Sequence, residues 1–222
     1  IFEKQNWESF SIPPPFKIKT VEPIHCPSVE ERIQAIQQAH YNTFLLPSSQ
    51  VYMDLLTDSG TSAMSDYQWA GIMLGDESYA GSVNFDHLEQ AVRDIFGYAH
   101  MVPTHQGRGA EHILSQILIK KGDVIPGNMY FTTTKLHQEL AGGTFADIII
   151  QEAHDPASEH PFKGNVDLTQ LSKLIQTHGA KRIPYISLEA CVNMAGGQPF
   201  SMENLEQLRK LTLSHRIKIF LD

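Results

Sequence analysis

Short apolar segments alternate with amphipathic segments over the second half of the sequence, and this alternation is the strongest constraint on the fold. Leucines at helical spacing follow Asp167 and Ser201, and both of these residues are suitable helix caps. The isoleucine run at 148–150 is too apolar for a strand exposed to solvent, which indicates a buried strand. Strand–helix–strand order predicts an α/β fold with a mainly parallel sheet between helices. Four segments have the composition of strands: residues 128–131, 145–151, 182–188 and 217–221.

The first half is predicted to be helical after an extended arm. Residues 1–24 contain three consecutive prolines and little periodicity, which indicates an extended segment. Ser28 and Ser65 each begin a capping-box pattern at a helix start. Two further helices are expected, one ending at Gly97 and one near Gly122.

Composition excludes several classes of protein. The formal net charge of −8 argues against a nucleic-acid partner, which normally requires a basic face. The sequence has neither a membrane-spanning apolar run nor a secretory signal pattern. Its two cysteines, Cys26 and Cys191, are too few for a disulfide framework or a zinc cluster. A chain with so few cysteines is expected in the reducing cytoplasm. The eleven histidines show no ligand-like spacing, so we expect no bound transition metal.

A glycine-rich loop precedes the helix that ends near Gly122. Gly107 and Gly109 permit close approach of the backbone to a ligand, and a helix N-terminus attracts anions. Arg108 adds a cation, so the loop at residues 104–111 is a candidate for binding phosphate. The alternative is an ordinary tight turn. The glycine spacing is not that of a Rossmann dinucleotide-binding loop.

Three predicted strands end at residues that can bind a ligand, since ligands of parallel sheets lie at the carboxyl ends of strands. Phe131 can stack on a flat heterocycle, although taken alone it is better explained as a core residue. Asn193 can bond a phenolate-type oxygen, or simply form a turn before Gly196. Asp222 directly follows an apolar strand and favours a cationic partner such as the protonated pyridine nitrogen of pyridoxal phosphate, unless it caps a further helix.

The segments taken together resemble the β-eliminating lyases, the family of tyrosine phenol-lyase and tryptophanase. The resemblance covers residues 16–222, and Thr132 favours the tyrosine-cleaving members because tryptophanases typically have aspartate there. The motifs that carry it are Thr57–Thr61, Gly75–Ser82, Pro103–Glu111, Asn128–Thr134, Phe162–Gly164 and Ala195–Pro199.

The resemblance implies a fold-type I pyridoxal-phosphate enzyme that forms a homodimer or homotetramer. It would convert L-tyrosine to phenol, pyruvate and ammonia. The implied domains are the arm at residues 1–24, a segment of a small domain at 25–56, and the first part of a large cofactor-binding domain at 57–222. The lysine that carries the cofactor in the family lies beyond Asp222, so we expect an incomplete, inactive fragment. Lys120, Lys121 and Lys135 lie in the wrong segments to replace it.

The resemblance also assigns roles to individual positions. Gln106, Gly107 and Arg108 would hold the cofactor's phosphate and Asn193 its phenolic oxygen. Phe131 would stack on the cofactor ring, and Asp222 would pair with the ring nitrogen.

Further positions would act on the substrate or bind a cation. Thr57 and Ser59 would lie near the substrate carboxylate, Thr132 would contact the phenol hydroxyl, and Tyr79 would act as the acid. The Gly60 carbonyl and Glu77 would bind potassium.

Two other functions remain open at this stage. One is tryptophanase or another amino-acid β-lyase of the same family, which relative activity on tyrosine and tryptophan would distinguish. The other is a non-catalytic phosphate-binding module, which a natural chain end at Asp222 would favour.

Overall fold

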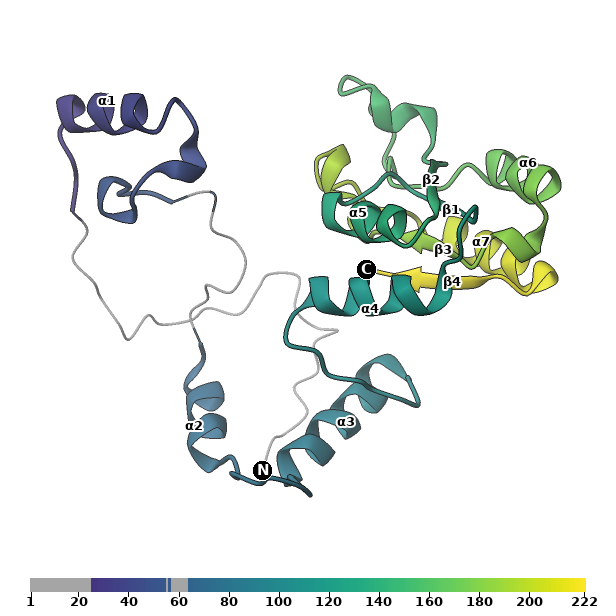
Figure 1. The fold of residues 1–222 in the computed structure, drawn as a ribbon, viewed down its shortest axis with the longest axis horizontal. Coiled ribbons are helices and arrows are strands. Elements are labelled where there is room, and N and C mark those ends of the chain that lie inside the picture. The colour runs from purple at the N-terminus through teal and green to yellow at the C-terminus, as the bar shows by residue number, and fades with distance from the viewer. Residues whose placement is uncertain (1–24, 55, 57–63) are drawn as a thin grey trace. The chain divides into compact units, whose positions relative to one another are not determined.

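The computed structural model describes residues 25–54, 56 and 64–222, so the predicted arm at residues 1–24 lies outside the described residues. The chain divides into two compact units, Ile1–Phe85 and Asp86–Asp222, and helix α3 (Val83–Phe96) crosses the boundary between them. The elements are labelled in Figure 1. Among the described residues, no helix has the length and apolar character that a membrane span requires.

Local sequence signals account for the helices of the first unit. Helix α1 (Val29–Gln38) starts at the Ser28 capping box, in which Ser28 Oγ accepts from the Glu31 amide at 3.2 Å. Short 3₁₀ turns follow at Thr43–Leu45 (η2) and Ser48–Gln50 (η3). Helix α2 (Asp66–Leu74) starts at a second capping box. Both predicted boxes are confirmed.

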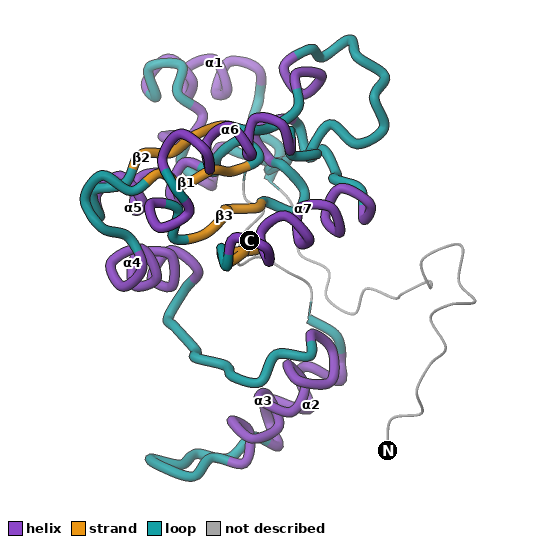
Figure 2. Tube along the Cα trace, turned by 90° about the vertical axis from the view of Figure 1, so that its right-hand side faces the viewer, coloured by secondary structure: helices purple, strands orange, loops and turns teal. Residues whose placement is uncertain are grey.

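The second unit has the predicted alternation of helices and strands, which Figure 2 shows in the described chain. Its four strands form one parallel sheet in the order β2-β1-β3-β4. The elements are α4 (Gly107–Leu118), β1 (Val124–Gly127), α5 (Thr132–Leu140), β2 (Thr144–Asp147), η4 (Gln151–His154), α6 (Leu168–His178), η5 (Ala180–Arg182), β3 (Tyr185–Leu188), η6 (Asn193–Ala195), α7 (Met202–His215) and β4 (Lys218–Leu221).

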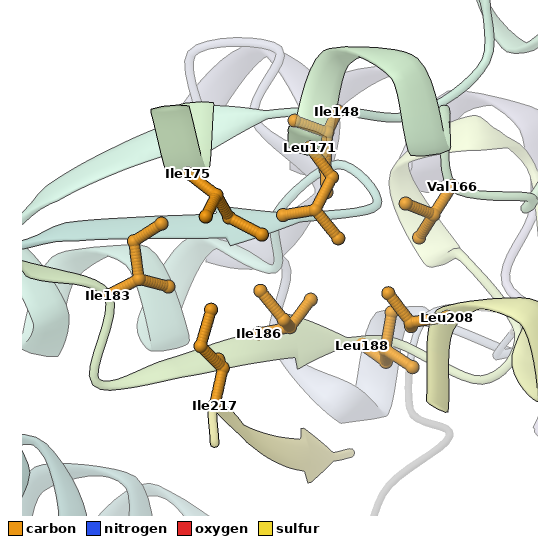
Figure 3. Packing of buried hydrophobic residues seen from close by; sticks show 9 residues of the cluster. All are labelled: Ile148, Val166, Leu171, Ile175, Ile183, Ile186, Leu188, Leu208 and Ile217. Carbon is orange, nitrogen blue, oxygen red and sulfur yellow. The ribbon is translucent and has the colours of Figure 1, made fainter. Parts of the chain in front are cut away.

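Helices cover both faces of this sheet, as predicted. Alternate residues of β3 point to opposite sides, because side chains of a strand have a period of two. Ile186 and Leu188 pack with Leu171 of α6 and Leu208 of α7 in the main core, shown in Figure 3. Tyr185 instead packs in a second cluster, with residues from the ends of α4 and α5 beside it.

The first strand lies four residues earlier than predicted. The prediction placed it at 128–131, whereas β1 is Val124–Gly127 and the helix α5 that follows was not predicted. The strand was missed because it contains Pro126 and Gly127, and both residue types are uncommon in strand interiors. Gly127 is required by packing, since a Cβ there would lie 2.7 Å from the Ser187 carbonyl oxygen of β3.

The second predicted strand is shorter than expected. β2 ends at Asp147, although Ile148 and Ile149 after it are fully or nearly buried. The Asp147 side chain accepts the Ile149 amide at 3.0 Å, which turns the chain away from the ladder. The apolar run at 148–150 therefore contributes to the core without extending the strand.

A buried asparagine joins three segments at the carboxyl edge of the sheet. Asn128 follows β1 and is fully buried. Its Oδ1 accepts the Glu189 amide at 2.8 Å, and its Nδ2 donates to the carbonyl oxygens of Gly164 and Glu189, each at 3.0 Å. These bonds hold the segments after β1 and β3 against the Gly164 turn.

Replacement of Asn128 by alanine should therefore destabilise the fold. Buried partners left without hydrogen bonds each cost about 1–3 kcal/mol, so we expect a loss of roughly 2–5 kcal/mol in the free energy of unfolding. Denaturant titration measures it. Gln176→Ala, which removes an exposed amide from α6, is the control and should change stability by less than about 0.5 kcal/mol. Equal effects of the two substitutions would contradict the prediction.

Candidate active site

Phe131 and Asp222 line the same pocket at the carboxyl edge of the sheet. Asp222 directly follows β4, and its backbone continues the pairing with β3. Its amide donates to the Leu188 carbonyl at 2.8 Å, and its carbonyl accepts the Ala190 amide at 3.0 Å. Phe131 is the N-cap residue of α5, four residues after the end of β1. The sheet thus brings together two residues that are 91 positions apart.

Two glutamates surround the Asp222 carboxyl. Glu189 lines the same pocket, and Glu111 of α4 lies close enough to act on Asp222 electrostatically. Burial, followed by the charge of Glu111, raises the pKa of Asp222 above its ordinary value. Burial also raises the pKa of Glu189; a hydrogen bond from the Asn193 amide opposes this shift, and the charge of Asp222 adds to it.

These carboxylates are incompletely paired among the described residues. Glu111 Oε1 accepts from Thr134 Oγ1 at 2.9 Å, but Glu111 Oε2 and Glu189 Oε2 are buried without a hydrogen-bond partner. A concentration of negative charge in a partly dehydrated site is costly unless a cation enters it. The carboxylates at this pocket therefore suit a ligand group that carries positive charge.

The start of α4 has the features expected of an anion-binding turn. Gln106 is its N-cap residue and makes no side-chain capping bond. The Gln106 carbonyl accepts the amides of Gly109 and Ala110, whereas the first helical amides, those of Gly107 and Arg108, have no acceptor within the helix. Glu111, one turn further along α4, lies close enough to Asp222 to act on it electrostatically.

Asn193 is adjacent to the same site. It begins η6 just after the buried Val192, and its backbone amide donates to the Glu189 carboxylate. Glu189 lines the pocket with Phe131 and Asp222, so its bond to Asn193 places Asn193 at the same edge of the sheet. Thr132 follows Phe131 as the first residue of α5 and is exposed.

Lys135 also lines the pocket, a position that no local pattern predicts. Its Nζ lies 4.5 Å from the centroid of the Tyr130 ring and 3.9 Å from Glu139 Oε1. These contacts direct its charge to Tyr130 and Glu139.

The remaining predicted site residues lie elsewhere in the chain. Thr57, Ser59 and Gly60 fall outside the described residues. Glu77 and Tyr79 are exposed in the first unit, in the loop between α2 and α3. Asp76 organises that loop by accepting the Val83 and Asn84 amides and the Ser82 hydroxyl, and these backbone bonds lower its pKa. In the described parts of the chain, no three His, Cys, Asp or Glu side chains are grouped to hold a metal ion.

Sequence reasoning overlooked Glu189, Glu111 and Thr134. Glu189 follows β3 as Asp222 follows β4, so the rule that ligands lie at strand ends was sufficient to find it. Glu111 and Thr134 carry no such signal, because their contact joins two different helices.

The residues at this edge fit pyridoxal phosphate by their chemistry. Free amides at a helix N-terminus and an arginine suit its phosphate, an aromatic side chain suits its ring, and uncompensated carboxylates suit a protonated ring nitrogen. Gln106–Arg108, Phe131 and Asp222 supply these groups.

Comparison with solved structures confirms the predicted fold class. Aspartate aminotransferase from Thermotoga maritima superimposes with a TM-score of 0.56 at 13% identity, over 88% of this chain and 51% of that chain. The α/β fold with its parallel sheet is that of the fold-type I pyridoxal-phosphate enzymes.

Sequence comparison identifies close relatives. Tyrosine phenol-lyase of Nostoc punctiforme is 68% identical over 208 residues, and that of Symbiobacterium sp. is 62% identical over 208 residues. Each match covers 94% of this chain, and the chain spans 44–45% of the length of these relatives.

A family model described as Beta-eliminating lyase matches residues 54–222, a segment that contains the whole sheet, the α4 turn and Asp222. The chain therefore belongs to the β-eliminating lyase family.

Proposed function

We propose that the complete polypeptide carrying this chain is a pyridoxal-phosphate-dependent carbon–carbon lyase that converts L-tyrosine to phenol, pyruvate and ammonia. The observation that carries the proposal is the shared pocket of Phe131 and Asp222, surrounded by incompletely paired carboxylates, in a chain of this family. Relatives named tyrosine phenol-lyase at 58–68% identity support the choice of substrate. We further propose a cytoplasmic homotetramer.

The first group of residues holds the cofactor. Gln106, Gly107 and Arg108 bind the phosphate through backbone amides and the guanidinium group. Phe131 stacks on the ring, and Asn193 bonds its phenolic oxygen. Asp222 keeps a proton on the ring nitrogen. An ion pair in contact is worth about 5 kcal/mol at a protein-like effective dielectric constant. It favours the ionised form of Asp222 and so opposes the burial and the Glu111 charge that raise the pKa of Asp222.

The second group acts on the substrate. Bound cofactor supplies an electron sink for the charge left when Cα loses its proton. Thr57 and Ser59 bind near the substrate carboxylate, and Thr132 contacts the phenol hydroxyl. Tyr79 donates a proton to the departing phenol ring, a role that contributes roughly 10²–10⁴-fold for a general acid.

A monovalent cation and a second subunit complete the proposed site. The Gly60 carbonyl and the Glu77 carboxylate bind potassium, and Glu77 and Tyr79 act from the neighbouring subunit. The full exposure of Tyr79 in the single chain agrees with a role at an interface. The lysine that carries the cofactor belongs to the part of the polypeptide beyond Asp222.

Assays of the complete polypeptide test this proposal. With pyridoxal phosphate and potassium, it should release equal amounts of phenol and pyruvate from tyrosine. The rival function is tryptophanase, so indole release from tryptophan is measured in parallel. Preference for tryptophan, or no turnover of either amino acid, would overturn the proposal.

Asp222→Asn should lower kcat/KM for tyrosine by at least about 100-fold, since several kcal/mol of charge pairing are lost.

The same substitution should stabilise the cofactor-free protein at neutral pH. The folded-state pKa of Asp222 is raised, so its ionised form opposes folding, and stability falls as pH rises through that pKa. Thermal unfolding from pH 3 to pH 8 should show the benefit of asparagine only above the unfolded pKa of about 3.9.

A benefit of asparagine that is equal at pH 3 and pH 7 would contradict this electrostatic explanation. Asp155→Asn is a suitable control, because Asp155 is an exposed aspartate after η4. It should leave kcat/KM essentially unchanged.

Thr132→Val should lower kcat/KM for tyrosine by about tenfold, the loss expected for one hydrogen bond to a substrate hydroxyl. S-methyl-L-cysteine has no phenol hydroxyl and should be cleaved at nearly the original rate. Steady-state kinetics on the two substrates separate the effects. A parallel loss on both would show that Thr132 acts on the fold or the cofactor rather than on the phenol group.

A further inference from the structure

The turn that leads to Phe131 contains a backbone conformation unfavourable for its residue. Met129 has φ = 68°, in the left-handed region that favours glycine. The chain must pass from the end of β1 at Gly127 to the start of α5 at Thr132 within four residues. Met129 makes the reversal, and Phe131 follows two residues later.

The Asp147 side chain bonds directly to the residue with the left-handed conformation, beside the bonds that Asn128 makes. Asp147 is the last residue of β2, where it is the register partner of Gly127. Its Oδ1 accepts the amide of Met129 at 3.0 Å and the amide of Ile149 at 3.0 Å. A single carboxylate oxygen therefore joins the ends of β1 and β2. Asp147 Oδ2 also lies 3.9 Å from His154 Nε2.

The same strand supports the residue between Met129 and Phe131. The Tyr130 ring makes an edge contact with Phe145 of β2, with centroids 5.9 Å apart. Lys135 Nζ lies 4.5 Å from the centroid of the Tyr130 ring. Tyr130 and Phe145 line the pocket together with Phe131 and Asp222. β2 thus supports the turn at two successive residues.

We propose that Asp147 is a positioning residue, which fixes the left-handed turn at Met129 and thereby the Phe131 ring over the cofactor site. This inference rests on the proposed function. Asp147 is not among the residues that line the pocket of Phe131 and Asp222, and it reaches the turn through the backbone amide of Met129. Glycine at position 129 would adopt the same φ at no steric cost, so it should make the Asp147 bond dispensable.

The test measures the dissociation constant of pyridoxal phosphate and the circular dichroism of the bound cofactor in the complete polypeptide. Asp147→Ala should weaken cofactor binding by about tenfold, as for loss of a charge-assisted hydrogen bond, and should reduce the dichroism. Asp147→Asn keeps the acceptor oxygen and should stay within about threefold of the unmodified protein. His154→Ala removes only the contact of His154 with Asp147 Oδ2 and should leave cofactor binding and dichroism unchanged.

A double substitution distinguishes the turn from general damage. Met129→Gly combined with Asp147→Ala should restore binding and dichroism, whereas Met129→Ala combined with Asp147→Ala should not, because alanine retains a Cβ. If Met129→Gly restores cofactor binding and dichroism no better than Met129→Ala does, Asp147 acts through Ile149 and the core, and the inference is wrong. Unchanged binding by Asp147→Ala overturns it as well. Failure of the unmodified protein to bind the cofactor overturns the proposed function and this inference together.

Discussion

Parallel pairing of β1, β3 and β4 determines where chemistry can occur in this protein. Because parallel strands end at the same edge, residues following three different strands meet there: Phe131 after β1, Glu189 after β3 and Asp222 after β4. The backbone of Asp222 extends the pairing with β3 by two further hydrogen bonds, which fixes its carboxylate at the rim of the sheet. The proposed cofactor site depends on this alignment.

Negative charge at this edge opposes stability and favours binding. Asp222 and Glu189 both have raised pKa values, and Glu111 contributes to the shift of Asp222. The protonated ring nitrogen of the proposed cofactor would relieve this repulsion, so part of the free energy needed to assemble the site would be recovered on binding. The two buried glutamate oxygens without partners are consistent with a site arranged for a bound molecule.

Several motifs of the sequence are explained by packing rather than by chemistry. Gly164 and Pro199 belong to two of the motifs, and the Gly164 amide donates to the Pro199 carbonyl at 2.9 Å. A Cβ at Gly164 would lie 2.7 Å from the Gln198 carbonyl oxygen, so only glycine permits the contact. Asn128, from a third motif, donates to the carbonyl of Gly164 at 3.0 Å. These residues support the loops that present the site.

The α/β class and the capping boxes at Ser28 and Ser65 could be predicted from the sequence. Local patterns suffice for these features because helix caps and apolar periodicity act within a few residues. Phe131 was singled out as the end of a strand at 128–131, whereas it caps the helix α5. The end of β1 at Gly127, the approach of three carboxylates and the bond from the Met129 amide to Asp147 are visible only in the folded chain. Each of these depends on contacts between segments distant in the chain, such as the approach of Gly127 to Ser187, and no local pattern records them.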